Sequence, residues 1–219
     1  MASIDLINLL QLKIAFLLAY FPTISFSGWL QAFINKRLGD DTAADEGFLT
    51  LDPAVHFDPF GFFILVFPWQ FIGMEMNFGF GRRVPINVDN IQGKFKTLRS
   101  IALMFSSSIS YLISTLLVIT VFLFGIFLTL KVSAFNFATY GNLGKALTMF
   151  SQALVSLNIS LFLVYTVISI VNLIVYSVDE DSFIRRNQFS WIFLIIIVAA
   201  LLMNPLERLL FSFLASIFG

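Results

Sequence analysis

The sequence predicts an all-α polytopic membrane protein with about four transmembrane helices and one re-entrant segment, because it is strongly apolar, poor in charge and divided into five long apolar segments. Of its 219 residues, 58% are hydrophobic and only 12% are charged, whereas a soluble domain carries roughly a quarter charged residues. Five apolar segments each reach the length of about 20 residues that crosses a hydrocarbon core. We therefore expect residues 1–219 to form a single integral membrane domain.

Composition also excludes several classes of protein. The net charge is zero, so nothing in the sequence indicates a nucleic-acid partner. Because the chain has no cysteine, it can form no disulfide, no thiolate metal site and no cysteine nucleophile. The partners that remain are membrane lipids and the transmembrane segments of other proteins.

The first apolar segment, residues 6–33, is interrupted by Pro22 and contains one charged side chain, Lys13. An unpaired charge at the membrane centre costs on the order of 3 kcal/mol. Lys13 should therefore have a partner or extend its ammonium group toward the surface. Glu207 in the last apolar segment is the predicted partner, and Arg208 competes for it.

The second apolar segment, residues 59–80, is predicted to re-enter the membrane and return to the same side. Pro68 and three glycines interrupt it, which is tolerated at membrane depth where the chain is buried in protein. Re-entry places nine basic residues on one side and three on the other, while full crossing gives a weaker split of seven against five. The nine are Lys36, Arg37, Arg82, Arg83, Lys94, Lys96, Arg99, Arg185 and Arg186, and the three are Lys131, Lys145 and Arg208.

The remaining apolar segments, residues 101–130, 146–178 and 189–219, are predicted to span the membrane. The middle one carries polar residues whose spacing puts them on one helical face. They are Ser151, Asn158, Tyr165, Ser169, Asn172 and Tyr176. Such groups either hydrogen-bond to neighbouring helices or line a wet cavity, and the sequence leaves both interpretations open.

Short motifs of Gly, Asp and Pro lie in the polar regions beside the second segment. In chain order they are Gly39-Asp40, Asp52-Pro53, His56-Phe57-Asp58-Pro59-Phe60-Gly61 and Pro85-Ile86-Asn87. In order and spacing they resemble the loop motifs of the short, prokaryotic-type branch of the site-2 protease family, which are intramembrane zinc metalloproteases. The resemblance extends to Asn172 and implies a site-2-protease-like fold in a bacterial cytoplasmic membrane.

The resemblance also implies a zinc site, and here the sequence departs from the family. The family binds zinc through His-Glu-x-x-His, with two imidazoles one helical turn apart and the Glu as general base. The two His positions fall on Ser27 and Gln31, and the Glu position falls on Gly28. The third ligand of the family, an Asp, falls on Glu180. We therefore expect no catalytic residue, no bound metal and no other cofactor.

His56, the single histidine, is expected to fix its loop by hydrogen bonding together with Asp58. A metal site of oxygen ligands is conceivable from Asp52 and the acidic run 179–181, but that run has the pattern of a solvated turn. A serine hydrolase is disfavoured because His56 is the only base that Ser27 could use.

Together these observations predict a pseudoprotease that serves as a binding, scaffold or accessory subunit for other membrane proteins. Two alternatives remain. One is a functional intramembrane metalloprotease with non-standard ligands. The other is a small transporter component, which should contain paired intramembrane charges or inverted repeats.

Overall fold

The computed structural model describes residues 6–67, 77–131 and 141–177, and every regular element within these ranges is helical. Three helices there are long and apolar enough to cross a membrane, with candidate spans at Leu9–Leu38, Ser106–Gly125 and Gly144–Ser177. This confirms the prediction of an all-α membrane-type protein. The predicted span 189–219, with Glu207, and the family position Glu180 lie outside the described residues.

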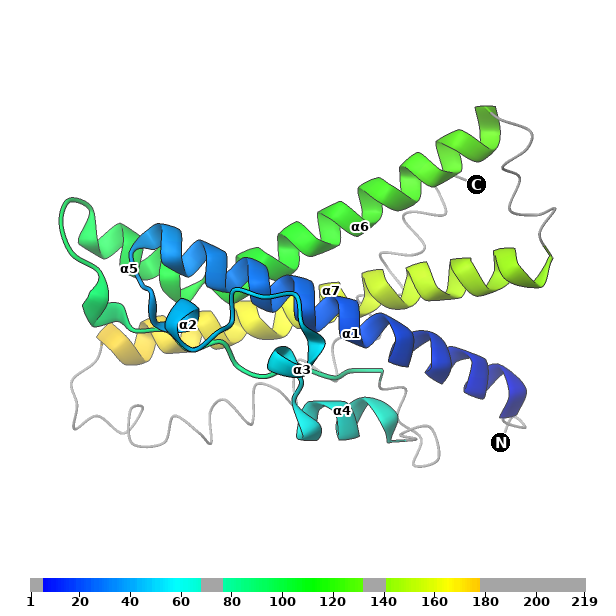
Figure 1. Ribbon diagram of the computed structural model, residues 1–219, viewed down its shortest axis with the longest axis horizontal. Coiled ribbons are helices and arrows are strands. Elements are labelled where there is room, and N and C mark those ends of the chain that lie inside the picture. Colours follow the sequence, from blue (N-terminus) through cyan, green and yellow to red (C-terminus); the bar gives the residue numbers. More distant parts are fainter. Residues whose placement is uncertain (1–5, 68–76, 132–140, 178–219) are drawn as a thin grey trace.

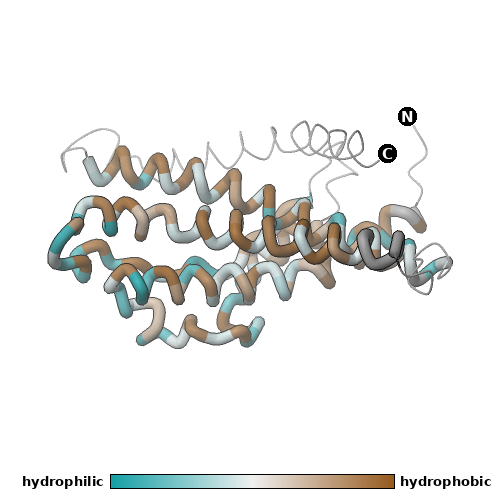
Figure 2. Tube along the Cα trace, turned by 90° about the horizontal axis from the view of Figure 1, so that it is seen from above, coloured by the Kyte–Doolittle hydropathy of each residue, from teal (hydrophilic) through white to brown (hydrophobic). Residues whose placement is uncertain are grey.

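The three long helices form a bundle (Figure 1). They are α1 (Leu6–Leu38), α6 (Ser106–Lys131) and α7 (Asn142–Ser177). Helix α6 runs antiparallel to α1, because Ser27 contacts Ser114 and Gln31 contacts Ser106. It also runs antiparallel to α7, because Ser108 contacts Ser169 and Tyr111 stacks on Tyr165. Residues of high hydropathy follow the long helices, and hydrophilic residues gather mainly at their ends (Figure 2). Such a distribution suits helices that face lipid.

Helix α1 continues through Pro22 and ends at Leu38, five residues beyond the predicted segment. Proline removes one backbone hydrogen bond, and nearby Ser or Thr side chains commonly bond to the carbonyls in such a turn. Here Ser25 Oγ donates to the carbonyl of Phe21 at 2.7 Å. The helix ends in a Schellman motif in which Gly39, at φ +101°, bonds back to Lys36 and Asp40 bonds back to Asn35.

The predicted span 101–130 is two helices. Helix α5 (Lys96–Met104) is separate from α6, and the break lies at Phe105. Helix α5 is amphipathic, with Leu103 buried and Leu98 exposed. Its Arg99 donates to the carbonyl of Leu38, one of the orphan carbonyls at the end of α1, which holds α5 across that end of the bundle.

The short helix α4 (Pro59–Val66) lies beside the first half of α1 and runs in the opposite direction (Figure 1). Eight residues of helix span about 12 Å, less than half of a hydrocarbon core. The Lys13 ammonium donates to the carbonyls of Leu65 at 3.1 Å and Phe67 at 3.4 Å. Lys13 thus binds the backbone at the C-terminal end of α4.

The two ends of the segment 59–80 lie side by side against α1. The hydroxyl of Tyr20 donates to the carbonyl of Phe80 at 2.9 Å and lies 3.4 Å from the carbonyl of Asp58. A Cβ on Gly61 would lie only 1.9 Å from the Phe80 carbonyl oxygen, so the returning chain packs directly on α4. Re-entry of residues 59–80 stays a prediction, because residues 68–76 lie outside the described ranges.

Cysteine labelling tests this topology in a chain that has no native cysteine. Glu46 and Lys94 are exposed residues on either side of the segment 59–80. If the segment re-enters, Glu46→Cys and Lys94→Cys will react with a membrane-impermeant maleimide from the same face of the membrane. Labelling from opposite faces would show a full crossing.

Candidate functional site

Ser27 and Gln31, the positions at which the resemblance expects zinc-binding histidines, lie buried on the face of α1 that packs against α6. Ser27 Oγ is 2.9 Å from Ser114 Oγ, and Gln31 Nε2 donates to Ser106 Oγ at 3.3 Å. Both side chains therefore hydrogen-bond to hydroxyl groups of a neighbouring helix. Sequence reasoning missed Ser114 as a partner, although Ser106, Ser110 and Ser114 recur every four residues, which is the spacing of one helical face.

Gly28, between them, lies directly against the imidazole ring of His56. A Cβ on Gly28 would be 2.3 Å from His56 Nδ1 and 2.8 Å from Cε1. Contacts below about 3 Å are not found for real Cβ atoms, so no side chain fits at position 28 while the ring is in place. The ring occupies the space into which a carboxylate at this position would have to extend.

The protonation of His56 follows from its partners. Nε2 is 2.8 Å from the carbonyl oxygen of Thr50, which can only accept, so Nε2 carries the proton. Nδ1 is left with its lone pair against Gly28, and among the described residues it has no hydrogen-bond partner. Burial lowers the pKa of His56 below its ordinary value, although the Thr50 carbonyl and the charge of Asp52 act in the opposite direction.

His56 also joins two loops. Its carbonyl oxygen accepts a hydrogen bond from the Arg82 N–H at 2.7 Å, and its ring meets Phe48 edge-on with centroids 5.6 Å apart. A Cβ on Gly81 would lie 2.8 Å from the same carbonyl oxygen. His56 thus holds two segments against α1: its own loop, which precedes α4, and the segment around Arg82, which follows α4 in the sequence. This extends the prediction that His56 fixes its loop, although its partner is Thr50 and not Asp58.

Asp40 is the second polar centre of the loops and is fully buried. Its carboxylate accepts hydrogen bonds from the Thr42 hydroxyl at 2.6 Å, the Thr42 N–H at 3.1 Å, the Asn87 N–H at 2.8 Å and Asn90 Nδ2 at 2.8 Å. Burial alone would raise the pKa of Asp40, but these bonds outweigh it and hold the pKa below the ordinary value. Asp40 therefore ties the end of α1 to the loop around η2 (Val88–Asn90).

The two Asp-Pro motifs each begin a helix. Asp52 accepts from the Ala54 N–H at 2.9 Å and caps α3 (Pro53–His56), while Asp58 accepts from the Gly61 N–H at 2.6 Å and caps α4. Proline suits the first helical position, where the missing N–H costs nothing. Asn87 caps η2 through the Asp89 N–H in the same way, with Pro85 just before it. The motif residues therefore have local structural roles.

The polar face of α7 makes interhelical contacts at several of its predicted positions. Asn158 Nδ2 donates to Thr23 Oγ1 at 3.2 Å, and Ser169 Oγ donates to the carbonyl of Met104 at 2.9 Å. Tyr165 stacks on Tyr111, while Tyr176 is exposed. Asn172 is half-buried on the same helix. These contacts match the interhelical interpretation better than a cavity lined along the whole face.

The residues at the replaced positions do not fit zinc. Zinc in proteins takes Cys, His, Asp or Glu, and Ser27 and Gln31 present a hydroxyl and an amide that are already hydrogen-bonded. Within residues 6–67, 77–131 and 141–177 no three His, Cys, Asp or Glu side chains gather closely enough to hold a metal ion. The acidic run 179–181 lies outside these ranges.

Comparison with known proteins adds a distant relationship. The described fold defines a helical protein of integral-membrane type. The chain is similar to the Bacillus subtilis (strain 168) protein named "Putative zinc metalloprotease YwhC", with 29% identity over 150 residues that cover 68% of this chain. The chain spans 60% of the length of that relative. No family model matches the chain, and no solved structure matches it. The likeness supports a metalloprotease-like relationship at a coarse level.

The contact between Gly28 and His56 predicts a large effect from one added methyl group. Gly28→Ala should destabilise the protein by about 1–3 kcal/mol, because a buried ring must shift to accept the Cβ. In the Gly28→Ala, His56→Ala double variant the methyl group has room, so the combined loss should be smaller than the sum of the single losses. Thermal unfolding in detergent measures these effects.

Gly125→Ala in α6 is the matched control for this experiment, because nothing lies within 4 Å of a Cβ there. It should be neutral or slightly stabilising, since alanine favours a helix over glycine. Strictly additive losses in the double variant would contradict the contact.

The neutral state of His56 predicts a loss of stability on acidification. Its pKa is lowered in the folded protein, so the unfolded chain binds the proton first as the pH falls below about 6.5. Stability should be full at pH 7.5 and should fall between pH 6.5 and the lower folded-state pKa. Because His56 is the only histidine, His56→Gln should remove this dependence. An unchanged pH profile in His56→Gln would assign the effect to other groups.

Proposed function

We propose that this chain is a catalytically inactive, site-2-protease-like membrane protein, a pseudoprotease that binds transmembrane segments of partner proteins. It would act as a scaffold or accessory subunit of a membrane complex, in the cytoplasmic membrane of a bacterium. The proposal includes one membrane domain with about four spans and a re-entrant segment at residues 59–80.

The observation that carries the proposal is the packing of His56 on Gly28. A site-2-type reaction requires zinc to activate a water and a carboxylate to take its proton. At the position of that carboxylate this chain has a glycine whose Cβ site is 2.3 Å from the His56 ring. The neighbouring Ser27 and Gln31 use their polar atoms in contacts with α6. Both features suit helix packing better than metal chemistry.

The architecture around these positions supports a binding role. Asp40, Asp58 and Tyr20 make hydrogen bonds that hold the loops and α4 in defined places on α1. On α6, the apolar side chains of Leu116, Val121 and Phe124 are exposed in the described part of the chain. Transmembrane helices associate through close packing and interhelical hydrogen bonds, so such a surface can accept a partner helix or lipid.

The competing function is a metalloprotease with non-standard ligands, which the name of the Bacillus subtilis relative favours. Elemental analysis of protein purified without a histidine tag separates the two. We expect far less than one zinc per wild-type chain. A variant with Ser27→His, Gly28→Glu and Gln31→His should gain zinc only when His56→Ala also makes room at position 28.

About one zinc per wild-type chain would overturn the proposal. So would cleavage of a co-expressed membrane substrate that Glu180→Ala abolishes. Partner binding is tested separately with a photo-crosslinking residue at exposed Val121, compared with the same residue at buried Ser110. Adducts to lipid alone from position 121 would count against the scaffold role.

A further inference from the structure

We propose that the crevice between the first halves of α1 and α7 is a binding site for a single anionic glycerophospholipid. The phosphate would lie at Lys145 and one acyl chain would lie along the apolar part of the crevice. This inference concerns a surface away from the replaced metal positions, and it stands whether or not the chain is a pseudoprotease.

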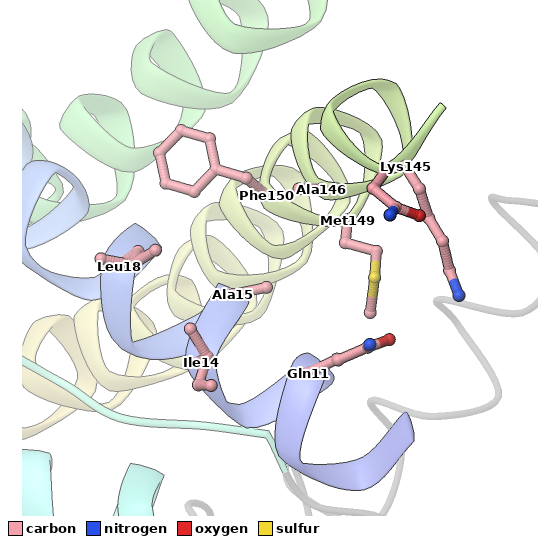
Figure 3. Close-up of a pocket in the computed structure, with 9 residues that line it drawn as sticks. Gln11, Ile14, Ala15, Leu18, Lys145, Ala146, Met149 and Phe150 are labelled. Atoms are coloured by element: carbon pink, nitrogen blue, oxygen red, sulfur yellow. The ribbon is translucent and has the colours of Figure 1, made fainter. Parts of the chain in front are cut away.

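The crevice has a volume of about 440 Å³, within the range of about 300–1,000 Å³ that is typical of small-molecule sites. Helix α1 contributes Gln11, Ile14 and Leu18, and α7 contributes Lys145, Met149 and Phe150. Figure 3 shows that the two ends of the crevice differ in chemistry: Gln11 and Lys145 lie toward one end, and Leu18 and Phe150 toward the other. A ligand that fits must itself be polar at one end and apolar at the other.

The polar end offers hydrogen-bond donors and a positive charge. Gln11, Asn142 and Lys145 are all exposed, and each can donate. No carboxylate lines the described part of the crevice. Among the described residues the one salt bridge joins Lys36 to Asp41 at the opposite end of α1, so Lys145 has no acidic partner there. A phosphate supplies both the negative charge and the acceptor oxygens that this end lacks.

A site for a lipid headgroup should lie near one end of the long apolar helices, and the polar end of the crevice lies near the start of both α1 and α7. Helices α1 and α7 run in the same direction, and Gln11 and Lys145 lie in the first two turns of their helices. Leu18 is seven residues beyond Gln11, which is about 10 Å further into the bundle. The apolar end therefore lies where acyl chains lie. Ile14 and Leu18 remain 55% and 60% exposed, so this surface is open to a ligand in the described part of the chain.

A lipid fits this surface better than a partner helix does. A helix seated here would have to place an acidic side chain beside Lys145 to match its charge. A phospholipid has that charge built into its headgroup, and a basic residue near the membrane surface contributes about five-fold to its affinity for anionic lipid. The polar end of the crevice thus suits a phosphate group, and its apolar end suits the attached alkyl chain.

The proposal is tested on the full chain with phosphatidylglycerol, by native mass spectrometry after delipidation and by crosslinking to a photoreactive phosphatidylglycerol. One lipid should bind above the background of weaker adducts, and crosslinks should map to peptides covering residues 11–18 and 142–150. Lys145→Gln should weaken binding about five-fold. Ala146→Trp, which fills the crevice from an exposed position, should abolish the specific adduct.

Lys94→Gln, the same charge change at an exposed position before α5, is the matched control and should leave the adduct unchanged. Diacylglycerol with the same chains should bind the wild type no better than phosphatidylglycerol binds Lys145→Gln. Equal binding by all three variants and the wild type would mean bulk lipid only and would overturn the proposal. So would crosslinks that map outside the two helices, or capture of a protein that phosphatidylglycerol does not displace.

Discussion

The contact between the His56 ring and the backbone of Gly28 is the constraint on which the arrangement around α1 depends. Its strength comes from enclosure: Nε2 is held by the Thr50 carbonyl, the ring edge meets Phe48, and the backbone carbonyl is held by the Arg82 N–H. The ring can approach α1 this closely because position 28 has no Cβ. A change at either residue would therefore move the loop before α4 and the chain that returns after it.

Much of the local structure could be predicted because it depends on short-range chemistry. Gly39 ends α1 in a left-handed conformation, and Asp58, Pro59 and Gly61 begin α4 as an N-cap motif should. The break at Phe105 lies just before the three serines 106–108, but hydropathy does not separate a break from a short polar run within one long segment. The placement of α5 across the end of α1 involves Arg99, which reaches the carbonyl of Leu38 from 61 residues away in the sequence. Long-range contacts of this kind leave no periodic signal.

The sequence could indicate where the candidate site lies along the first helix, but not which side chains contact its residues. Spacing from the loop motifs placed Ser27 and Gln31 one helical turn apart, with Gly28 directly after Ser27. In the structure Ser27 and Gln31 contact α6, and Gly28 contacts His56. The partners Ser114 and Ser106 lie 87 and 75 residues away, so sequence spacing could not pair them. The contact of the His56 imidazole with Gly28 could not be predicted either, because a sequence motif gives the order of residues and not the direction of a side chain.

The hydrogen-bond partners of buried polar side chains are important in a membrane protein. A polar group without a partner at membrane depth destabilises the fold, so Ser27, Gln31 and Lys13 each need a hydrogen bond within the protein. Lys13 solves this problem beside α4, where its ammonium group donates to the carbonyls of Leu65 and Phe67. Pairing with Glu207 stays a prediction, but Lys13 no longer requires it. Ser27 and Gln31 likewise hydrogen-bond to serine hydroxyl groups of α6, so their polar atoms are already occupied and do not offer a metal site.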